Sequence, residues 1–213
     1  MKFHQSVLAP HRIFVLSPAN CGGERARLLL RERSSFLQAE LIRSPKGLPL
    51  GDLFSFLSAL YFRSKLAYAR TFAHPPPGAP GVHIITPTRG LRLPHEPVTL
   101  ELLQEFASVN IKENDVRYRS PFEKDARELS LLLGENAELV LLGSIATRKY
   151  LDVLGEIFQD RLWFPAEFVG RGDMSRGGLL LRCVQEDREL RYIPGSSAVW
   201  HGSRPANLKP ICP

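Results

Sequence analysis

Asn20 is the residue whose type and place most strongly suggest chemistry. It lies in the stretch SPANCGG, residues 17–23, directly after an apolar run that ends at Leu16. Asn is a preferred helix-capping residue, so one interpretation is that it only starts the next helix. The other is an amide held at a strand end, where Gly22 and Gly23 let a ligand approach the backbone and a helix start behind them favours an anion.

Two further groups of polar residues accompany apolar segments. Tyr61 and Arg63 lie in a helical stretch, and their polar ends suit the edge of a binding site. Thr86, Thr88 and Arg89 follow a second apolar run in the stretch TPTRG. An arginine there can pair with a phosphate or a base edge. A loop arginine that lies only in solvent is the plain alternative.

The stretch FVGRGDMSRGG, residues 168–178, places Arg171, Asp173, Ser175 and Arg176 among four glycines. Its composition predicts a flexible loop. The functional interpretation is that its arginines contact phosphates while its glycines let the backbone approach a strand or groove. A surface loop without such a role is the alternative.

The sequence lacks the motifs of several enzyme classes. GxGxxG and GxxxxGK[ST] do not occur, so nucleotide-cofactor binding has no support. The six histidines have no metal-ligand spacing, and GxSxG, HExxH and CxxC are also missing. We therefore expect no cofactor and no metal. A reaction that uses Asn, a carboxylate and a bound water stays open.

Apolar runs bounded by turn residues predict four buried strands, within HRIFVLS, VHII, ELVLL and RLWF. Helical spacing predicts helices within GGERARLLLRER, over residues 51–73 with a break near Tyr61, and over residues 147–158. LLLRCV and ELRYI predict a C-terminal hairpin. Residues 194–213, rich in Pro, Ser and Gly, predict a loosely ordered tail after a single domain of residues 1–193.

Strands that alternate with helices predict an α/β/α sandwich around a central, mainly parallel sheet of about four strands. Each predicted strand ends in a small polar cluster: SPANCGG, TPTRG, GSIATRK and PAEFVGRGDMSRGG. In open parallel sheets, ligands bind where such loops meet at the carboxyl ends of the strands. The pattern therefore predicts a site at that edge.

Composition narrows the class of protein further. The chain has 213 residues and a net charge of +6, with a pI near 9.5, which suits a polyanionic partner but equally a basic enzyme. Three widely spaced cysteines predict neither a disulfide framework nor a zinc site. We find no signal peptide and no apolar run long enough to span a bilayer, so we expect a cytoplasmic protein without a membrane partner.

The order of the motifs resembles a known superfamily. VLSPANCGG, LYFRSKLAYARTFA, HIITPTRGLRLP, LVLLGSIATRKYLDVL and FPAEFVGRGDMSRGG, over residues 11–185, are similar to the uracil-DNA-glycosylase-like superfamily. The likeness is greater to bacterial antiphage DNA glycosylases that excise α-glucosylated 5-hydroxymethylcytosine from phage DNA. The GQDPYH and HPSPLS motifs of uracil-DNA glycosylases are not present.

The resemblance implies an enzyme that flips a base out of double-stranded DNA with modified bases and cleaves its N-glycosidic bond, leaving abasic sites that block phage replication. Asn20 would orient the attacking water. The residues that would line the base pocket are Tyr61, Arg63, Thr86, Thr88, Arg89 and Ser144. Those that would bind the DNA are Arg148, Lys149, Arg171, Ser175 and Arg176. No protein partner is implied.

Two alternatives stay open. One is an N-glycoside hydrolase or base exchanger that acts on free nucleosides or nucleotides and needs no affinity for duplex DNA. The other is a DNA-binding accessory protein without enzymatic activity, for which Asn20 would be dispensable.

Overall fold

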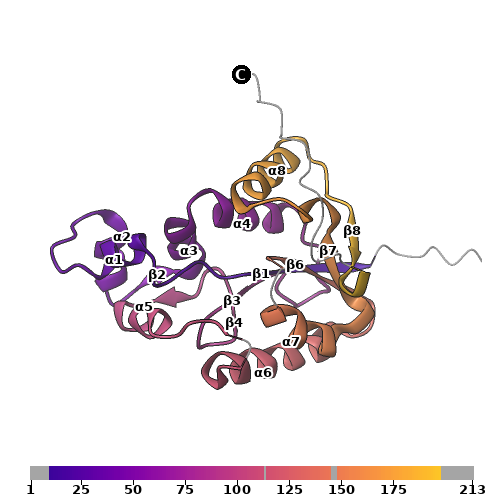
Figure 1. Ribbon diagram of the computed structural model, residues 1–213, viewed down its shortest axis with the longest axis horizontal. Helices are drawn as coiled ribbons and strands as arrows, with labels where there is room; N and C mark the ends of the chain where they lie inside the picture. Colours follow the sequence, from indigo (N-terminus) through magenta and orange to yellow (C-terminus); the bar gives the residue numbers. More distant parts are fainter. Residues whose placement is uncertain (1–9, 113, 145–147, 198–213) are drawn as a thin grey trace, which may run out of the picture.

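The fold is that of a computed structural model of the chain (Figure 1). The structure describes residues 10–112, 114–144 and 148–197. Its centre is a six-stranded sheet with the order β4-β3-β1-β6-β7-β8. The four inner strands are parallel: β3 (Val82–Ile85), β1 (His11–Leu16), β6 (Ala137–Leu142) and β7 (Leu162–Pro165). The predicted α/β fold with a mainly parallel sheet is confirmed, and the predicted strands are these four.

Two short antiparallel strands extend the sheet beyond the predicted number. They are β4 (Leu91–Arg92), which pairs with β3, and β8 (Tyr192–Pro194), which pairs with β7. The prediction of about four strands is therefore too low. Strands of two or three residues lack a periodic pattern long enough to be recognised in a sequence.

Helices cover both faces of the sheet and make three layers (Figure 1). The helices α3 (Leu50–Ser58), α4 (Leu60–Phe72) and α8 (Asp173–Gln185) lie on one face. On the other face lie α6 (Val116–Leu133) and α7 (Arg148–Phe158). The end of the molecule beyond α3 holds α1 (Glu24–Leu30), α2 (Leu37–Arg43), α5 (Leu100–Ala107) and a small sheet of β2 (Leu48–Pro49) and β5 (Pro97–Val98).

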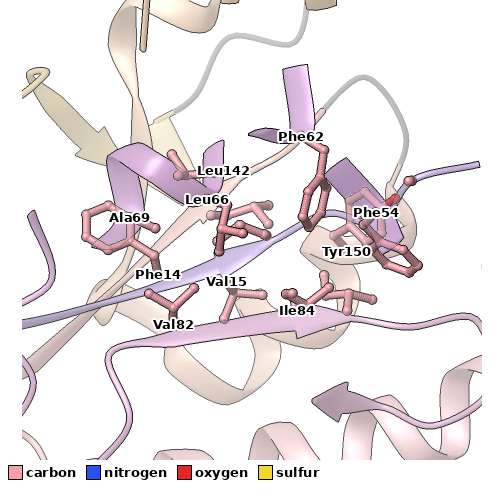
Figure 2. Packing of buried hydrophobic residues seen from close by; sticks show 14 of the residues in the cluster. Phe14, Val15, Phe54, Phe62, Leu66, Ala69, Val82, Ile84, Leu142 and Tyr150 are labelled. Carbon is pink, nitrogen blue, oxygen red and sulfur yellow. The ribbon is translucent and has the colours of Figure 1, made fainter. Parts of the chain in front are cut away.

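The core lies between these layers. In β1, every side chain from Ile13 to Leu16 is fully buried, because helices cover both faces of the strand. Figure 2 shows Leu66 and Ala69 of α4 above Phe14 and Val15 of β1. No helix in the described part of the chain is long and apolar enough to cross a membrane.

The long predicted helix over residues 51–73 is indeed broken. Ala59, with φ of 49°, separates α3 from α4, close to the expected break. This break turns the chain so that α4 begins at Leu60 and presents Tyr61 in its first turn.

The predicted C-terminal hairpin is wrong. LLLRCV belongs to α8, where Leu179, Leu180 and Cys183 form its buried face. ELRYI contributes only β8, which pairs with β7. A short apolar run fits a strand and a buried helix equally well, and packing against α4 decides for the helix here.

The same helix corrects a second prediction, the flexible loop over residues 168–178. From Asp173 onward that stretch is helical, with Gly172 as the N-cap. Of the predicted loosely ordered tail, Pro194 belongs to β8 and Gly195–Ser197 form a short 3-10 helix, while residues 198–213 lie outside the described part of the chain.

Candidate functional site

The crevice between the ends of β1 and β6 is the natural position for a ligand in this topology. The chain leaves β1 toward β3 through helices that include α4, and it leaves β6 toward β7 through α7 on the opposite face. Parallel pairing places Leu16 opposite Leu142, so both strands end at the same level. Ligands of open α/β sheets bind at such a switch point, outside the carboxyl ends of the strands.

A pocket of about 310 Å³ occupies this position. We call it the switch-point pocket. Its lining residues come from both strand exits and from α3, α4, α7 and α8: Ser17, Pro18, Ala19, Asn20, Ser58, Tyr61, Ser144, Lys149, Tyr150 and Asp173. Its volume is within the range of small-molecule sites. The structure thus places Asn20, Tyr61 and Ser144, three of the site residues proposed from the sequence, in the lining of one pocket.

A second pocket of about 380 Å³ adjoins the first. It shares Pro18, Ala19, Asn20, Lys149 and Tyr150 with the switch-point pocket and extends toward the segment after α5, which contributes Asn110 and Lys112. Asn20 and Lys149 therefore stand between two compartments of one larger site.

Asn20 is exposed, and its amide is held in one orientation. Its Oδ1 accepts a hydrogen bond from the Gly22 N–H at 3.0 Å, which makes an Asx turn. The N-cap of α1 is Gly23, and no side chain caps that helix end. The amide oxygen has a second lone pair, which remains available for a water or a ligand. Asn20 is thus a fixed polar group at the pocket rim rather than a helix cap.

Tyr61 and Tyr150 supply the aromatic surface of the switch-point pocket. Tyr61 is 7% exposed, and its buried hydroxyl makes no hydrogen bond of good geometry among the residues that the structure describes, although the Arg176 guanidinium lies near enough to act on it. Burial raises the pKa of Tyr61 to about 12, and burial also raises the pKa of Tyr150. Both side chains therefore stay neutral phenols near pH 7.

Lys65 is the most unusual residue near the pocket, and the sequence interpretation missed it. It is 1% exposed, and its Nζ donates hydrogen bonds to the backbone oxygen and the Oγ of Ser17. The ammonium also lies over the ring of Tyr61, 4.6 Å from the centroid. Burial lowers the pKa of Lys65 to about 7. A signal existed, because Lys65 falls on the apolar stripe that Tyr61, Tyr68 and Phe72 form along α4.

Asp173, the first residue of α8, adds a carboxylate to the pocket. It is mostly exposed, and its Oδ1 lies 3.8 Å from Nη1 of Arg176. The sequence interpretation quoted Asp173 but assigned it no role, because the segment was expected to be a loop.

Arg176 and Arg171 are positioned differently from what the DNA-binding prediction requires. Arg176 is buried, its Nε and Nη2 donate to the backbone oxygen of Phe168 at 3.3 and 3.1 Å, and its guanidinium covers the Phe168 ring. It is therefore not on the surface where a phosphate would bind. Arg171 donates to the backbone oxygen of Glu167 and to Oγ of Ser175. These contacts join the first turn of α8, which replaces the expected loop, to the short 3-10 helix Ala166–Phe168.

The predicted group after β3 lies outside the switch-point pocket. Thr86 is fully buried and holds the turn through hydrogen bonds with the Gly90 oxygen and the Arg89 N–H. Thr88 and Arg89 both donate to the carboxylate of Glu105 on α5, and Arg89 lines a different pocket of about 410 Å³. The prediction that these three residues line the same pocket as Asn20 is not met, because Glu105 holds two of them at the neighbouring edge.

Of the remaining residues predicted for the site, some line the two compartments and others do not. Lys149 lines both compartments, and its ammonium lies 5.0 Å from the ring centroid of Tyr150. Arg148 is exposed at the first position of α7. Arg63 is exposed on α4 and is not among the residues that line either compartment in the described part of the chain.

The described residues include no group of three or more His, Cys, Asp or Glu side chains that could hold a metal ion. No family model, curated protein or solved structure matches this chain.

Proposed function

We propose that the protein is a monofunctional DNA glycosylase, which hydrolyses the N-glycosidic bond of a modified pyrimidine in phage DNA. The observation that carries this proposal is that Asn20 and Tyr61 line one pocket at the topological switch point. That pocket combines aromatic walls for a planar base with a fixed amide and a carboxylate at its rim.

The chemistry needs no strong base. Departure of a base leaves an oxocarbenium-like sugar, which a poorly nucleophilic water attacks if it is held on the correct face. Asn20 holds this water through the free lone pair of Oδ1, and Asp173 is the carboxylate of the pocket that accepts the proton. The water oxygen bonds to C1′ as the C1′–N bond breaks, and the base leaves with the electron pair and takes up a proton.

The modified base proposed as substrate is α-glucosylated 5-hydroxymethylcytosine, and excision would leave abasic sites that block phage replication. The resemblance noted above supports this choice. The adjoining compartment supports it as well, since a sugar attached to the flipped base needs polar space beyond the base itself. Unmodified cytosine would lack those contacts, which would spare the host DNA.

Incubation of the purified protein with three DNAs tests the proposal. They contain cytosine, 5-hydroxymethylcytosine or α-glucosylated 5-hydroxymethylcytosine, and released bases and abasic sites are counted by mass spectrometry. We expect release from the glucosylated DNA, and a loss of at least 100-fold in Asn20→Ala with DNA binding retained. Asn136→Ala is the matched control, because Asn136 is exposed at the opposite end of β6. No release from any of the three DNAs contradicts the proposal.

One observation favours a second candidate, an N-glycoside hydrolase or base exchanger for free nucleosides or nucleotides. Arg176, the arginine expected to reach DNA from the last polar loop, is buried against Phe168. Such an enzyme would cleave the free nucleoside and would show little salt-dependent binding to duplex DNA. The same base-release assay with glucosylated nucleoside as substrate separates the two.

A further inference from the structure

The chain makes an excursion between the end of β1 and α3 that is rich in positive charge. We call residues 24–46, which hold α1, α2 and the turn between them, the α1–α2 unit. Six of these residues are Arg or Lys and three are Glu, so the unit has a net charge of +3, half of the +6 of the whole chain. A local excess of cations on a protein surface attracts polyanions.

Three of these cations, Arg31, Arg33 and Lys46, extend into solvent. All three residues are exposed, and their side chains form no hydrogen bond and no ion pair with the described part of the chain. Glu32 lies between the two arginines in the sequence and is exposed as well, but it is not paired with either of them. The N–H groups of these three side chains are therefore open to a ligand.

The turn that carries Arg31 and Arg33 is held in one conformation by Arg43 of α2. The Arg43 guanidinium donates hydrogen bonds of 2.5–3.3 Å to four backbone oxygens, those of Leu29, Arg31, Ser34 and Ala39. These oxygens belong to the end of α1, to the turn and to α2, so one side chain joins all three parts. The backbone of Arg31 is thereby fixed, while its side chain stays exposed.

The α1–α2 unit is also attached firmly to α3. The Phe36 ring stacks on the Phe56 ring, with 5.5 Å between their centroids, and Arg25 Nη1 donates to the Phe56 backbone oxygen at 2.8 Å. Its two helices share a small apolar core of Ala26, Leu29, Ala39 and Ile42. The exposed cations therefore stand on a rigid support, which reduces the ordering that binding would cost.

The unit extends from the same edge of the sheet as the switch-point pocket. Figure 1 shows α1 and α2 beyond the carboxyl end of β1. The helix α1 begins four residues after Asn20, and its seven residues span about 10 Å, since an α-helix rises about 1.5 Å per residue. Along a DNA duplex this is the length of about three base pairs, because each strand carries one phosphate per about 3.4 Å.

We propose that the α1–α2 unit binds the phosphates of the duplex that flanks the flipped nucleotide and supplies affinity that does not depend on the base. This inference rests on the proposed glycosylase function, which makes DNA the polyanion. The division of roles follows from the chemistry of the two surfaces. Free guanidinium and ammonium groups on a rigid support recognise phosphates, which are the same in every sequence, whereas the pocket recognises the base.

Arg31→Gln combined with Arg33→Gln tests the proposal, because both side chains are exposed and their loss should leave the fold intact. We expect the slope of log Kobs against log salt concentration to fall by about 2, and the Kd to rise about 10- to 60-fold near 0.1 M salt, the effect of losing two phosphate contacts. Fluorescence anisotropy measures both. The Kd should rise equally for duplexes with cytosine and with α-glucosylated 5-hydroxymethylcytosine, and the single-turnover rate of base release at saturating DNA should not change.

Arg70→Gln combined with Lys124→Gln is the matched control, because it removes the same net charge. Arg70 is exposed in the last turn of α4, and Lys124 is exposed on α6. This variant should keep the wild-type Kd and salt slope. A Kd and slope that stay at wild-type values in the Arg31 and Arg33 variant, or that change equally in the control, overturn the inference. A slower rate at saturating DNA without a change in Kd overturns it too.

Two further measurements separate the possible outcomes. Wild-type protein that releases no base from any DNA, but binds duplex DNA through Arg31 and Arg33, contradicts the glycosylase proposal and supports the present inference. Base release from modified DNA with an affinity that does not depend on the two arginines does the reverse. Sedimentation with phosphatidylserine vesicles tests a membrane as the partner. Vesicle binding through these arginines by a protein that does not bind duplex DNA overturns the inference.

Discussion

Lys65 and Ser17 join α4 to the end of β1 within the core. The Lys65 ammonium donates to the Ser17 backbone oxygen at 2.6 Å and to Ser17 Oγ at 2.8 Å, across a separation of 48 residues in the chain. Ser17 begins the segment that leads to Asn20, and Lys65 follows Tyr61 by one helical turn. This pair therefore ties the segment that carries the fixed amide to the helix that carries Tyr61.

Because burial lowers the pKa of Lys65, the stability of the protein should depend on pH. The pKa of this lysine is about 7 in the folded protein and 10.5 in an exposed lysine, so between these values the unfolded chain binds more protons than the folded one. The free energy of unfolding should then rise from pH 7 to pH 9, by up to about 1.4 kcal/mol per pH unit. Urea unfolding at a series of pH values measures it.

Lys65→Met should remove this slope, because methionine fills similar space without a charge. Lys124→Met, at an exposed lysine of α6, should retain it. Parallel curves for Lys65→Met and wild type between pH 7 and pH 9 would show that the buried ammonium is not the source of the pH dependence.

The buried side chain of His83 should make the stability depend on pH in the acidic range as well. Burial lowers the pKa of this β3 histidine to about 4, below the ordinary value of 6.5. The unfolded chain therefore takes up a proton first as the pH falls from 6.5 to 4, and stability is lost over that range. His83→Gln should flatten this part of the curve, whereas His74→Gln, at an exposed residue, should not. Unfolding curves that fall equally in all three proteins would contradict the assignment.

The crossing of α4 and α8 predicts a strong effect at Gly177. A Cβ there would lie 3.2 Å from Tyr61 Cα, and the backbone of α4 cannot yield as a flexible side chain would. Gly177→Ala should cost about 1–3 kcal/mol of stability, as overpacking does, and, if the proposed glycosylase activity holds, should reduce base release by shifting Tyr61. Differential scanning calorimetry and the base-release assay measure the two effects.

Gly155→Ala is the control for that substitution. Gly155 lies within α7, and no heavy atom of the described chain outside its chain neighbours and the surrounding helix backbone lies within 4 Å of the position that its Cβ would take. The substitution should stabilise the protein by about 0.5–1 kcal/mol, because alanine is the better helix former. Equal effects of the two substitutions would contradict a specific role for the close helix crossing.

If DNA is the substrate, Lys149 should contribute to the salt dependence of DNA binding. Its side chain lines both compartments at the rim of the site. Lys149→Met should weaken duplex binding and reduce the slope of log Kobs against log salt concentration by about 1, the effect of losing one phosphate contact. Fluorescence anisotropy at several salt concentrations measures the slope, with Lys124→Met as the control that should leave it unchanged.

The sheet edge that carries the candidate site could be predicted from the sequence, because the relevant signals are local. The apolar run from Ile13 to Leu16 and the run within β6 mark strands that are buried on both faces. The polar turns that follow them, with Asn20 and Ser144, must then meet at the carboxyl edge of a parallel sheet. The predicted α/β fold and these two lining residues depend on nothing more.

Only the tertiary structure decided which polar residues share the pocket, because contacts between residues far apart in the chain determine where each side chain lies. Glu105 binds Thr88 and Arg89 and keeps them at the neighbouring edge. Packing on α4 makes α8 a helix, which buries Arg176 and brings Asp173 to the site. A lysine in a helical sequence is ordinarily a solvent residue, and the Lys65 amine is accommodated in the core because Ser17, far away in the chain, supplies two acceptors.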